Sequence, residues 1–343
     1  MNVMESTHKK EIKIICTIGP ASENKKTLKG LIDAGMTIAR CNFSHGTHEE
    51  HGRKFALVRE LNKEYGYNVK IALDTKGPDI RLGDFEKGSI IVKEGDLFSL
   101  FCEDHVGNQK GISVTYRNLY QDLKAGDPVS FCSGLVLGKV KEIKGKEIVV
   151  EIEVGGKLAN HKCVNFPGVD VKLPFLSPAD IEDLKYGVEQ KVDLIMASFL
   201  NKVEDLHELR KIVGNIPVIA KIESAEGVKN MKAIIKEADG VMVARGGLGD
   251  NNPLEILPTI QKEMVRIANK QKKFVIVATE MMLNMCEKPR PSRAEVSDVY
   301  NAVMDGADAV MTSEETAMGN YPVETIKYMR KITNEAWRNK YGK

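Results

Sequence analysis

The sequence predicts an α/β protein, a (β/α)8 TIM barrel with a small all-β lid domain inserted into it. Two observations predict the barrel. An apolar strand, a turn with Gly or Ser and an amphipathic helix recur along the chain, and the strands number eight. A third observation predicts the insertion, because the alternation breaks once, after the third strand. The expected strands are residues 12–18, 36–43, 69–74, 192–199, 216–222, 240–244, 274–279 and 309–312.

Helical patterns lie between most of these strands, which favours a parallel sheet with covering helices. The expected helices are residues 25–34, 49–64, 203–213, 254–270, 293–306 and 323–339.

The break in the alternation covers residues 78–172, where β-branched runs and Gly-rich turns replace helical periodicity. We therefore expect the barrel to comprise residues 1–77 and 173–343, with 78–172 as the inserted lid. An insertion at the carboxyl end of a barrel strand overhangs the face that holds active sites in barrel enzymes. It is expected to move over a substrate.

Composition narrows the class of protein. The 343 residues are 42% hydrophobic and 29% charged, which is typical of a soluble globular protein. A net charge of +2 gives no general case for nucleic acid or membrane binding. We find no signal sequence and no apolar run long enough to span a membrane. Six scattered cysteines without a C-x-x-C pair favour reduced thiols and a cytoplasmic location.

The fifth expected strand ends in a charged pair, Lys221 and Glu223. Residues two apart on a strand face the same side, so the ammonium and the carboxylate point into the same space. A lysine there neutralises developing oxyanion charge and a carboxylate holds a hard cation, which suits a phosphate-bearing, metal-chelated substrate. The alternative is a structural ion pair at a strand end.

Polar side chains also end the second and third expected strands. Arg40, Asn42 and Ser44 alternate onto one side of the second strand, and Asp74 and Thr75 end the third. Arg40 offers a planar fork for a phosphate, and oxygens of the other four suit a weakly bound monovalent cation. The alternative is that these residues cap helix starts.

Gly246 and Gly247 follow the sixth strand, where backbone N–H groups can approach an anion ahead of a helix start. The chain has no G-x-x-x-x-G-K-S/T motif, so a nucleotide site here is not a P-loop. His45, His48 and His51 are spaced three apart, but we do not assign them to a metal.

Taken together, these residues resemble the pyruvate kinase family over nearly the whole chain. That family has a barrel with an inserted β lid and transfers a phosphoryl group between phosphoenolpyruvate and ADP, using Mg²⁺ or Mn²⁺ and K⁺. The resemblance implies the same fold, reaction, cofactors and ligands here. The matching motifs, in the family's order, are 17–22 (TIGPAS), 42–46 (NFSHG), 74–78 (DTKGP), 221–223 (KIE), 243–246 (VARG) and 290–298 (RPSRAEVSD).

The resemblance also implies roles by position. Lys221 would stabilise the transferring phosphoryl group and the enolate, Arg40 would contact a phosphate, and Thr279 would lie beside the methylene carbon of the substrate. The divalent metal would bind to Glu223. The remaining roles fall on Asn42, Ser44, Asp74 and Thr75 for K⁺, on Gly246 and Gly247 for the substrate, and on His45, Arg81 and Lys162 for the nucleotide phosphates.

Departures from the family pattern gather at the same site. Gly247 replaces an aspartate, which removes the second metal-binding carboxylate, and a Mg²⁺ site needs one or two carboxylates besides substrate oxygens. We therefore expect weak metal binding and reduced turnover. The other departures are Cys41, Cys132, Ser133, Cys163, Glu280, Leu283, Asn284, Glu314 and Met318.

Three interpretations stay open. In the first, the chain is a pyruvate kinase, with or without impairment at Gly247. Alternatively it is a diverged or redesigned barrel acting on a pyruvate-like or phosphorylated ligand, or a catalytically silent relative. A coupled assay for pyruvate separates the first from the others. The chain stops where the C-terminal effector domain of the family would begin, so we expect a hyperbolic response to phosphoenolpyruvate and a monomer or homodimer.

Overall fold

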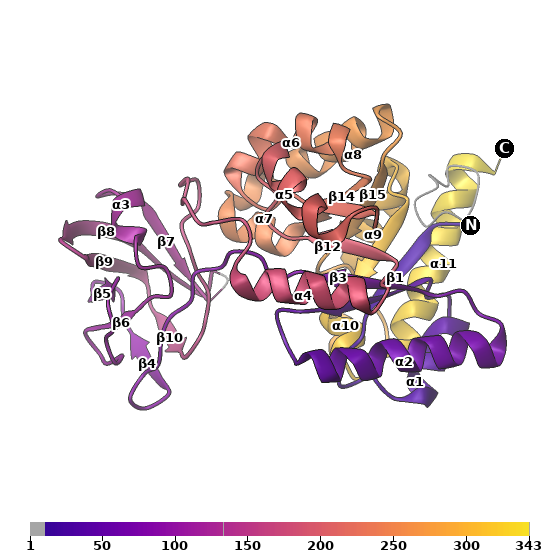
Figure 1. Cartoon of the computed structure of the whole chain (residues 1–343), viewed down its shortest axis with the longest axis horizontal. Helices are drawn as coiled ribbons and strands as arrows, with labels where there is room; N and C mark the ends of the chain where they lie inside the picture. The colour runs from indigo at the N-terminus through magenta and orange to yellow at the C-terminus, as the bar shows by residue number, and fades with distance from the viewer. Residues whose placement is uncertain (1–10, 133, 343) are drawn as a thin grey trace.

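A computed structural model describes residues 11–132 and 134–342. Among these residues, eight parallel strands close into a barrel in the order β1-β16-β15-β14-β13-β12-β3-β2 (Figure 1). The predicted barrel is confirmed, and each strand lies within two residues of its expected bounds. The barrel strands are β1 (Lys13–Thr17), β2 (Ile38–Asn42), β3 (Lys70–Asp74), β12 (Leu194–Ala197), β13 (Val218–Lys221), β14 (Gly240–Ala244), β15 (Phe274–Ala278) and β16 (Ala309–Thr312).

Helices follow the strands and cover the outside of the barrel (Figure 1). The six predicted helices are confirmed, although residues 254–270 divide into a short 3-10 turn and a longer helix. The covering helices are α1 (Lys25–Asp33), α2 (His48–Tyr65), α4 (Pro178–Glu189), α5 (Val203–Val213), α6 (Ala225–Glu237), α8 (Leu257–Lys270), α9 (Arg293–Asp305) and α11 (Pro322–Tyr341). Shorter turns are α7 (Arg245–Asn251), η1 (Leu254–Ile256), η2 (Leu283–Cys286) and α10 (Glu314–Ala317).

Helices α4 and α6 were not among the expected ones. Each contains an internal glycine, Gly187 or Gly227, which lowers helix propensity by roughly 1 kcal/mol relative to alanine. In α4, Pro178 occupies the first turn, and Ser177 and Asp180 form a capping box that satisfies two backbone N–H groups. Capping and tertiary packing therefore outweigh the weak internal propensity.

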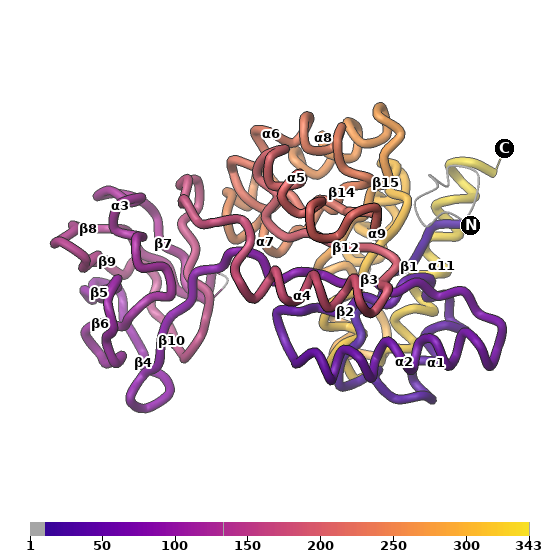
Figure 2. Tube along the Cα trace, viewed as in Figure 1, coloured from indigo at the N-terminus to yellow at the C-terminus, as the bar shows by residue number. Residues whose placement is uncertain are grey.

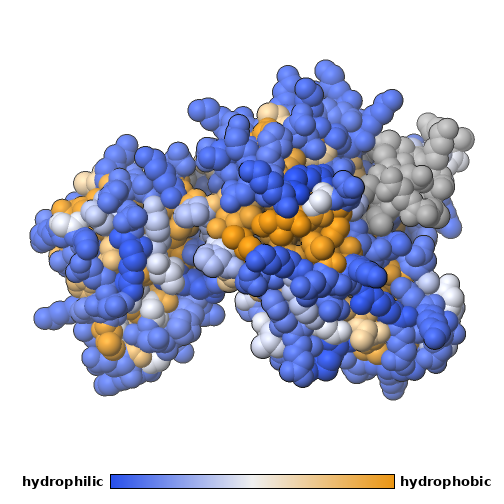
Figure 3. All heavy atoms as spheres, in the orientation of Figure 1, coloured by the Kyte–Doolittle hydropathy of each residue, from blue (hydrophilic) through white to orange (hydrophobic). Residues whose placement is uncertain are grey.

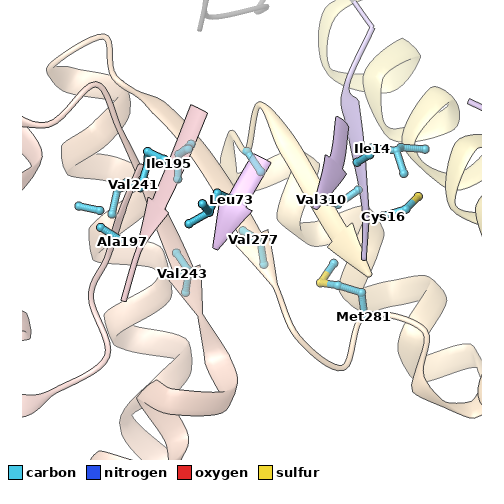
Figure 4. Close-up of a cluster of buried hydrophobic side chains, with 14 of the residues drawn as sticks. Ile14, Cys16, Leu73, Ile195, Ala197, Val241, Val243, Val277, Met281 and Val310 are labelled. Atoms are coloured by element: carbon cyan, nitrogen blue, oxygen red, sulfur yellow. The ribbon is translucent and has the colours of Figure 1, made fainter. Parts of the chain in front are cut away.

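The barrel strands are buried on both faces, because helices cover the outside and side chains of neighbouring strands fill the inside. On β1, Ile15 belongs to the interior cluster, whereas Ile14 and Cys16 pack outward against the helices. Figure 4 shows further outward side chains of this kind, among them Ile195 of β12, Val241 of β14 and Val310 of β16. Because inward and outward side chains are both buried, the strands are continuous apolar runs in the sequence.

The inserted segment lies between β3 and α4 and has its own apolar core, which includes the buried rings of Phe98 and Phe131. It forms a six-stranded sheet in the order β11-β7-β8-β9-β5-β6 and a two-stranded sheet, β10-β4. Its division from the barrel at residues 78 and 172 stays a prediction. The elements are β4 (Ser89–Val92), β5 (Leu97–Phe101), β6 (Gly111–Ser113), α3 (Leu119–Asp122), β7 (Pro128–Phe131), β8 (Val136–Lys144), β9 (Glu147–Val154), β10 (Gly156–Ala159) and β11 (Val164–Asn165).

The lid stands at one end of the barrel, and the chain enters it from β3 and returns to α4 (Figure 2). The return segment touches the barrel where Gly168 N donates to Asn251 O of α7 at 3.2 Å. A small pocket lies at this junction, lined on the lid side by Phe166 and on the barrel side by Phe199. The lid therefore borders the end of the barrel at which the strands terminate.

The face of the molecule in Figure 3 is mostly hydrophilic, with hydrophobic residues gathered between α4 and α5. Of the helices in the described part of the chain, none is both long enough and apolar enough to span a bilayer.

Candidate active site

The candidate site is built at the carboxyl ends of the barrel strands, the end where barrel proteins place functional residues. Asp74 is the last residue of β3, and Lys221 is the last residue of β13. Arg40 lies near the end of β2, which pairs with β3 so that Asn42 is opposite Asp74. Arg40 is opposite Ala72, two residues before Asp74, so its side chain reaches along the strands towards the ends that carry Asp74 and Lys221.

The carboxylate of Asp74 joins two cationic side chains. Its Oδ2 accepts a hydrogen bond from Arg40 Nε at 2.6 Å, and its Oδ1 accepts one from Lys221 Nζ at 2.8 Å. The carboxyl is fully buried, and burial alone would raise its pKa. The charges of Arg40 and Lys221 outweigh that effect, and the pKa of Asp74 lies below its usual value. Asp74 is therefore an ionised anchor for both cations.

Arg40 is also held from the other side. Its Nη1 donates to Thr17 Oγ1 at 2.7 Å, and Thr17 Oγ1 donates to the Thr312 carbonyl at 2.8 Å. Thr17 was not identified as a site residue from the sequence. The only available signal was its place at the end of the first strand, in the TIGPAS motif, since its contact with Arg40 depends on the closure of the barrel.

Lys221 and Glu223 lie together, as expected, but their contact is loose. Lys221 Nζ is 3.6 Å from Glu223 Oε1, whereas it donates to Ser198 Oγ at 2.6 Å. The other oxygen, Glu223 Oε2, accepts from Phe199 N at 3.0 Å. Burial raises the pKa of Glu223 above its usual value, and the nearby ammonium and Phe199 N–H oppose that rise only in part. Ser198 was missed by sequence reasoning.

Gly247 sits directly against Glu223. A Cβ atom at residue 247 would lie 2.7 Å from Glu223 Oε1. The carboxylate of Glu223 therefore lies where a side chain at position 247 would begin. The obstructing atom is the far end of a flexible side chain, which a small rotation would move.

Thr279 and Glu280 have strained backbones after β15. Their φ angles are 77° and 54°, in a region that is unusual for any residue with a side chain and most of all for a β-branched one. The guanidinium of Arg245 holds this turn, since its Nε donates to the carbonyls of Ala278 and Thr279 at 3.1 Å. Gly246 lets α7 begin close by, because a Cβ there would be 3.2 Å from Thr279 Cγ2.

The three residues predicted to face nucleotide phosphates lie near one another. Leu82 N donates to Lys162 O at 2.9 Å, which sets Lys162 beside the segment that carries Arg81. Burial lowers the pKa of His45, and the charges of Arg81, Arg40 and Lys162 lower it further. The side chain of Arg81 is already partly engaged, because its Nε donates to Asp79 at 2.6 Å.

The oxygen donors predicted for a monovalent cation adjoin one another at the ends of β2 and β3. Asn42 Oδ1 accepts from Ser44 N at 3.1 Å, and Phe43 N donates to the carbonyl of Asp74 at 2.9 Å. Thr75 Oγ1 accepts from Ser198 N at 3.0 Å. Within residues 11–132 and 134–342 there is no group of three or more His, Cys, Asp or Glu side chains that could hold a metal ion by itself.

The three evenly spaced histidines serve different contacts. His51 is buried, stacks on Phe43 with ring centroids 3.9 Å apart, and hydrogen-bonds the carbonyl of His45 through Nε2 at 2.8 Å. His48 pairs with Asp183, 135 residues away in sequence, at 2.6 Å. Asp183 belongs to α4, so this pair depends on the packing of α2 against α4. The histidines shape the loop before α2 and do not converge on one point.

Fold and site together define a barrel protein with an inserted β lid and a buried Arg–Asp–Lys group at its mouth, an arrangement suited to an anionic ligand. The family model for "Pyruvate kinase, barrel domain" matches residues 9–326. Curated pyruvate kinases from Clostridium perfringens and Geobacillus stearothermophilus are 44% and 46% identical to the chain over 333 and 331 residues. The chain belongs to the pyruvate kinase family.

The alignment covers 95% and 94% of this chain, but 70% and 56% of those two relatives. The pyruvate kinase of Clostridium acetobutylicum is 42% identical over 330 residues, again with 70% of its length covered. The chain thus spans between about half and about two thirds of the length of the curated relatives it matches.

The first prediction concerns the buried charges. Asp74→Asn leaves two buried cations with a neutral partner, and we expect it to lower the free energy of unfolding by about 3–5 kcal/mol. Lys221→Met leaves Asp74 paired with Arg40, so its loss should be clearly smaller. Urea denaturation of both variants measures the difference. Equal losses would contradict the role of Asp74 as the shared anchor.

A second prediction concerns acid stability. Burial lowers the pKa of His51 from 6.5 to about 4. Between these values the unfolded chain binds a proton that the folded chain does not, so the free energy of unfolding should fall as the pH drops from about 6.5 towards 4, by on the order of 2 kcal/mol from this residue.

His51→Phe keeps the aromatic stack on Phe43 but has no proton to bind. The fall in unfolding free energy between about pH 7 and pH 4.5 should therefore be smaller in this variant than in the parent protein. A fall of the same size in both proteins would show that His51 does not carry the effect.

Proposed function

We propose that the chain transfers a phosphoryl group from phosphoenolpyruvate to ADP, giving pyruvate and ATP. The observation that carries the proposal is the fixed ammonium of Lys221, held by Asp74 and Ser198 with the carboxylate of Glu223 beside it. Phosphoryl transfer depends mainly on positioned charge and little on covalent chemistry by the protein. The family relationship supports the same reaction.

In this proposal Lys221 and Arg40 bind the negative charge of the substrate. The bond between phosphorus and the enol oxygen breaks, a bond to a β-phosphate oxygen of ADP forms, and the ammonium of Lys221 stabilises the enolate left behind. The enolate becomes pyruvate when its methylene carbon gains a proton, and we assign Thr279 to that side of the substrate. The backbone N–H groups of Gly246 and Gly247 would orient the substrate.

Divalent metal binding is the weakest part of the proposed site. Glu223 provides one carboxylate, and its Oε1 lies 3.6 Å from Lys221 Nζ. Mg²⁺ is often held by one or two carboxylates together with substrate phosphates, so Glu223 fits a metal that binds with the substrate. When bound, Mg²⁺ or Mn²⁺ would neutralise phosphate charge. The oxygens of Asn42, Ser44, Asp74 and Thr75 fit K⁺.

The nucleotide would lie on the side of the mouth where His45 meets the lid. Arg81 and Lys162 are carried by the lid, so lid closure would bring their charges onto the phosphates of ADP. Arg81 would exchange its contact with Asp79 for one with the nucleotide, which links nucleotide binding to closure.

A coupled assay for pyruvate formation from phosphoenolpyruvate and ADP, with K⁺ present and Mg²⁺ or Mn²⁺ varied, tests the proposed function. We expect activity with a high metal requirement. Lys221→Met serves as the control, and it should remain folded and lose all pyruvate formation. Turnover that persists in the control would remove Lys221 from the mechanism. No pyruvate at any metal concentration would favour the diverged or silent alternatives.

The third prediction concerns Gly247. Gly247→Asp restores a second carboxylate beside Glu223, and we expect it to lower the Mn²⁺ dissociation constant by about tenfold or more and to raise turnover. Glu223 must rotate to make room. Isothermal titration calorimetry measures Mn²⁺ binding independently of activity.

Gly249→Asp is the matched control, because it adds the same charge to α7 but directs the side chain towards Leu254 and Leu257. It should leave Mn²⁺ binding nearly unchanged. If Gly247→Asp binds metal more tightly and still makes no pyruvate, the kinase proposal is wrong.

A further inference from the structure

Ser198 lies immediately after β12, next to the ammonium of Lys221. Its side chain is buried, and its Oγ is 2.6 Å from Lys221 Nζ, a shorter separation than the 2.8 Å between that nitrogen and Asp74 Oδ1. The proposed transfer reaction uses the ammonium of Lys221 and assigns no separate role to the hydroxyl of Ser198. What Ser198 contributes to the site is therefore a separate question.

The ammonium of Lys221 has three N–H donors and no acceptor. Asp74 Oδ1 and Ser198 Oγ accept two of these hydrogen bonds. Glu223 Oε1, at 3.6 Å, is too distant for a hydrogen bond of normal strength. Two fixed acceptors set the rotation of the ammonium group, so the direction of its third N–H is also set.

Ser198 is itself held rigidly. Its hydroxyl has one proton, which goes to the carbonyl of Thr75 at 2.6 Å in preference to Asp74 Oδ1 at 3.4 Å. Its backbone N donates to Thr75 Oγ1 at 3.0 Å. One lone pair of the hydroxyl accepts from Lys221 and its proton goes to Thr75, which leaves the hydroxyl little freedom to rotate.

The packing around Ser198 restricts its size. Gly77 has a φ of 73° and lets the chain after β3 pass so close that a Cβ at residue 77 would lie 2.7 Å from Ser198 Cβ. A larger polar residue at position 198 would collide with this loop. Serine supplies an acceptor for Lys221 and a donor for Thr75 in the available space.

We propose that Ser198 is a positioning residue that aims the Lys221 ammonium at the phosphoryl group of the substrate. Its kinetic effect rests on the proposed function, whereas its effect on the position of Lys221 does not. A displacement of about 1 Å in a group that acts in the transition state is enough to lower turnover by up to a hundredfold. Binding of the substrate, which also involves Arg40 and the backbone of α7, should change less.

The test uses Ser198→Ala in the full chain. We expect kcat for pyruvate formation to fall by about tenfold or more, with KM for phosphoenolpyruvate within about threefold of the parent value. The matched control is Thr325→Val, which removes a fully buried hydroxyl in the first turn of α11 that donates to Tyr321 O at 2.8 Å and has no assigned role in the site. Its kcat should remain within about twofold of the parent value.

Crystal structures of the parent and of Ser198→Ala provide a readout that does not need turnover. We expect Lys221 Nζ to move away from its place between Asp74 and residue 198, or to lose a single defined position. If the parent protein makes no pyruvate, the proposed function fails, and this comparison still decides whether Ser198 places Lys221.

An unmoved Lys221 in Ser198→Ala, or a kcat within about twofold of the parent value, would overturn the proposal and leave Ser198 as a packing residue. The proposal would also be overturned if Thr325→Val lowered kcat as much as Ser198→Ala did and if both variants lost the same amount of melting temperature. If Ser198→Ala did not fold, Ser198→Cys, which fills similar space with a weaker hydrogen-bonding group, would replace it under the same criteria.

Discussion

The buried charge of Asp74 is the constraint on which the barrel mouth depends. A carboxylate removed from water costs several kcal/mol unless it is paired and hydrogen-bonded. Asp74 meets this requirement twice, with Arg40 from the neighbouring strand β2 and Lys221 from β13, two places further round the barrel. Because each oxygen takes one cation, both cationic side chains are drawn inward and held at the level where the strands end. The stability of the mouth and the placement of its charges therefore share one cause.

The same electrostatic reasoning explains why the site is expected to bind a divalent metal weakly. Asp74 is occupied by its two cations, so Glu223 is the remaining carboxylate next to Lys221. The carboxylate of Glu223 lies where a Cβ atom at position 247 would begin, and its Oε1 is 3.6 Å from the ammonium of Lys221. A divalent cation there would face one anionic side chain and the positive charge of Lys221, so it would depend on the oxygens of a bound phosphate.

Arg245 stabilises the strained turn that follows β15. Thr279 and Glu280 both adopt left-handed backbone angles, which normally cost on the order of 1–3 kcal/mol each. Arg245 donates to the carbonyls on either side of the first of these residues and pairs with Asp298 of α9 at 2.7 Å. Its contacts tie together the ends of β14 and β15 and the start of α9, and they hold the hydroxyl of Thr279 beside Gly246.

The sequence by itself determined the barrel, the position of the insertion and the strand ends that carry Arg40, Asp74, Lys221 and Glu223, because alternation and apolar runs are local properties of the chain. Only the tertiary structure revealed Thr17 beside Arg40, Ser198 beside Lys221, Asp183 beside His48 and Glu223 against Gly247. All four pairs join residues from different parts of the fold, and the last also depends on the rotamer of Glu223. The stagger of the closed barrel and the packing of its loops decide such contacts, and neither leaves a periodic signal in the sequence.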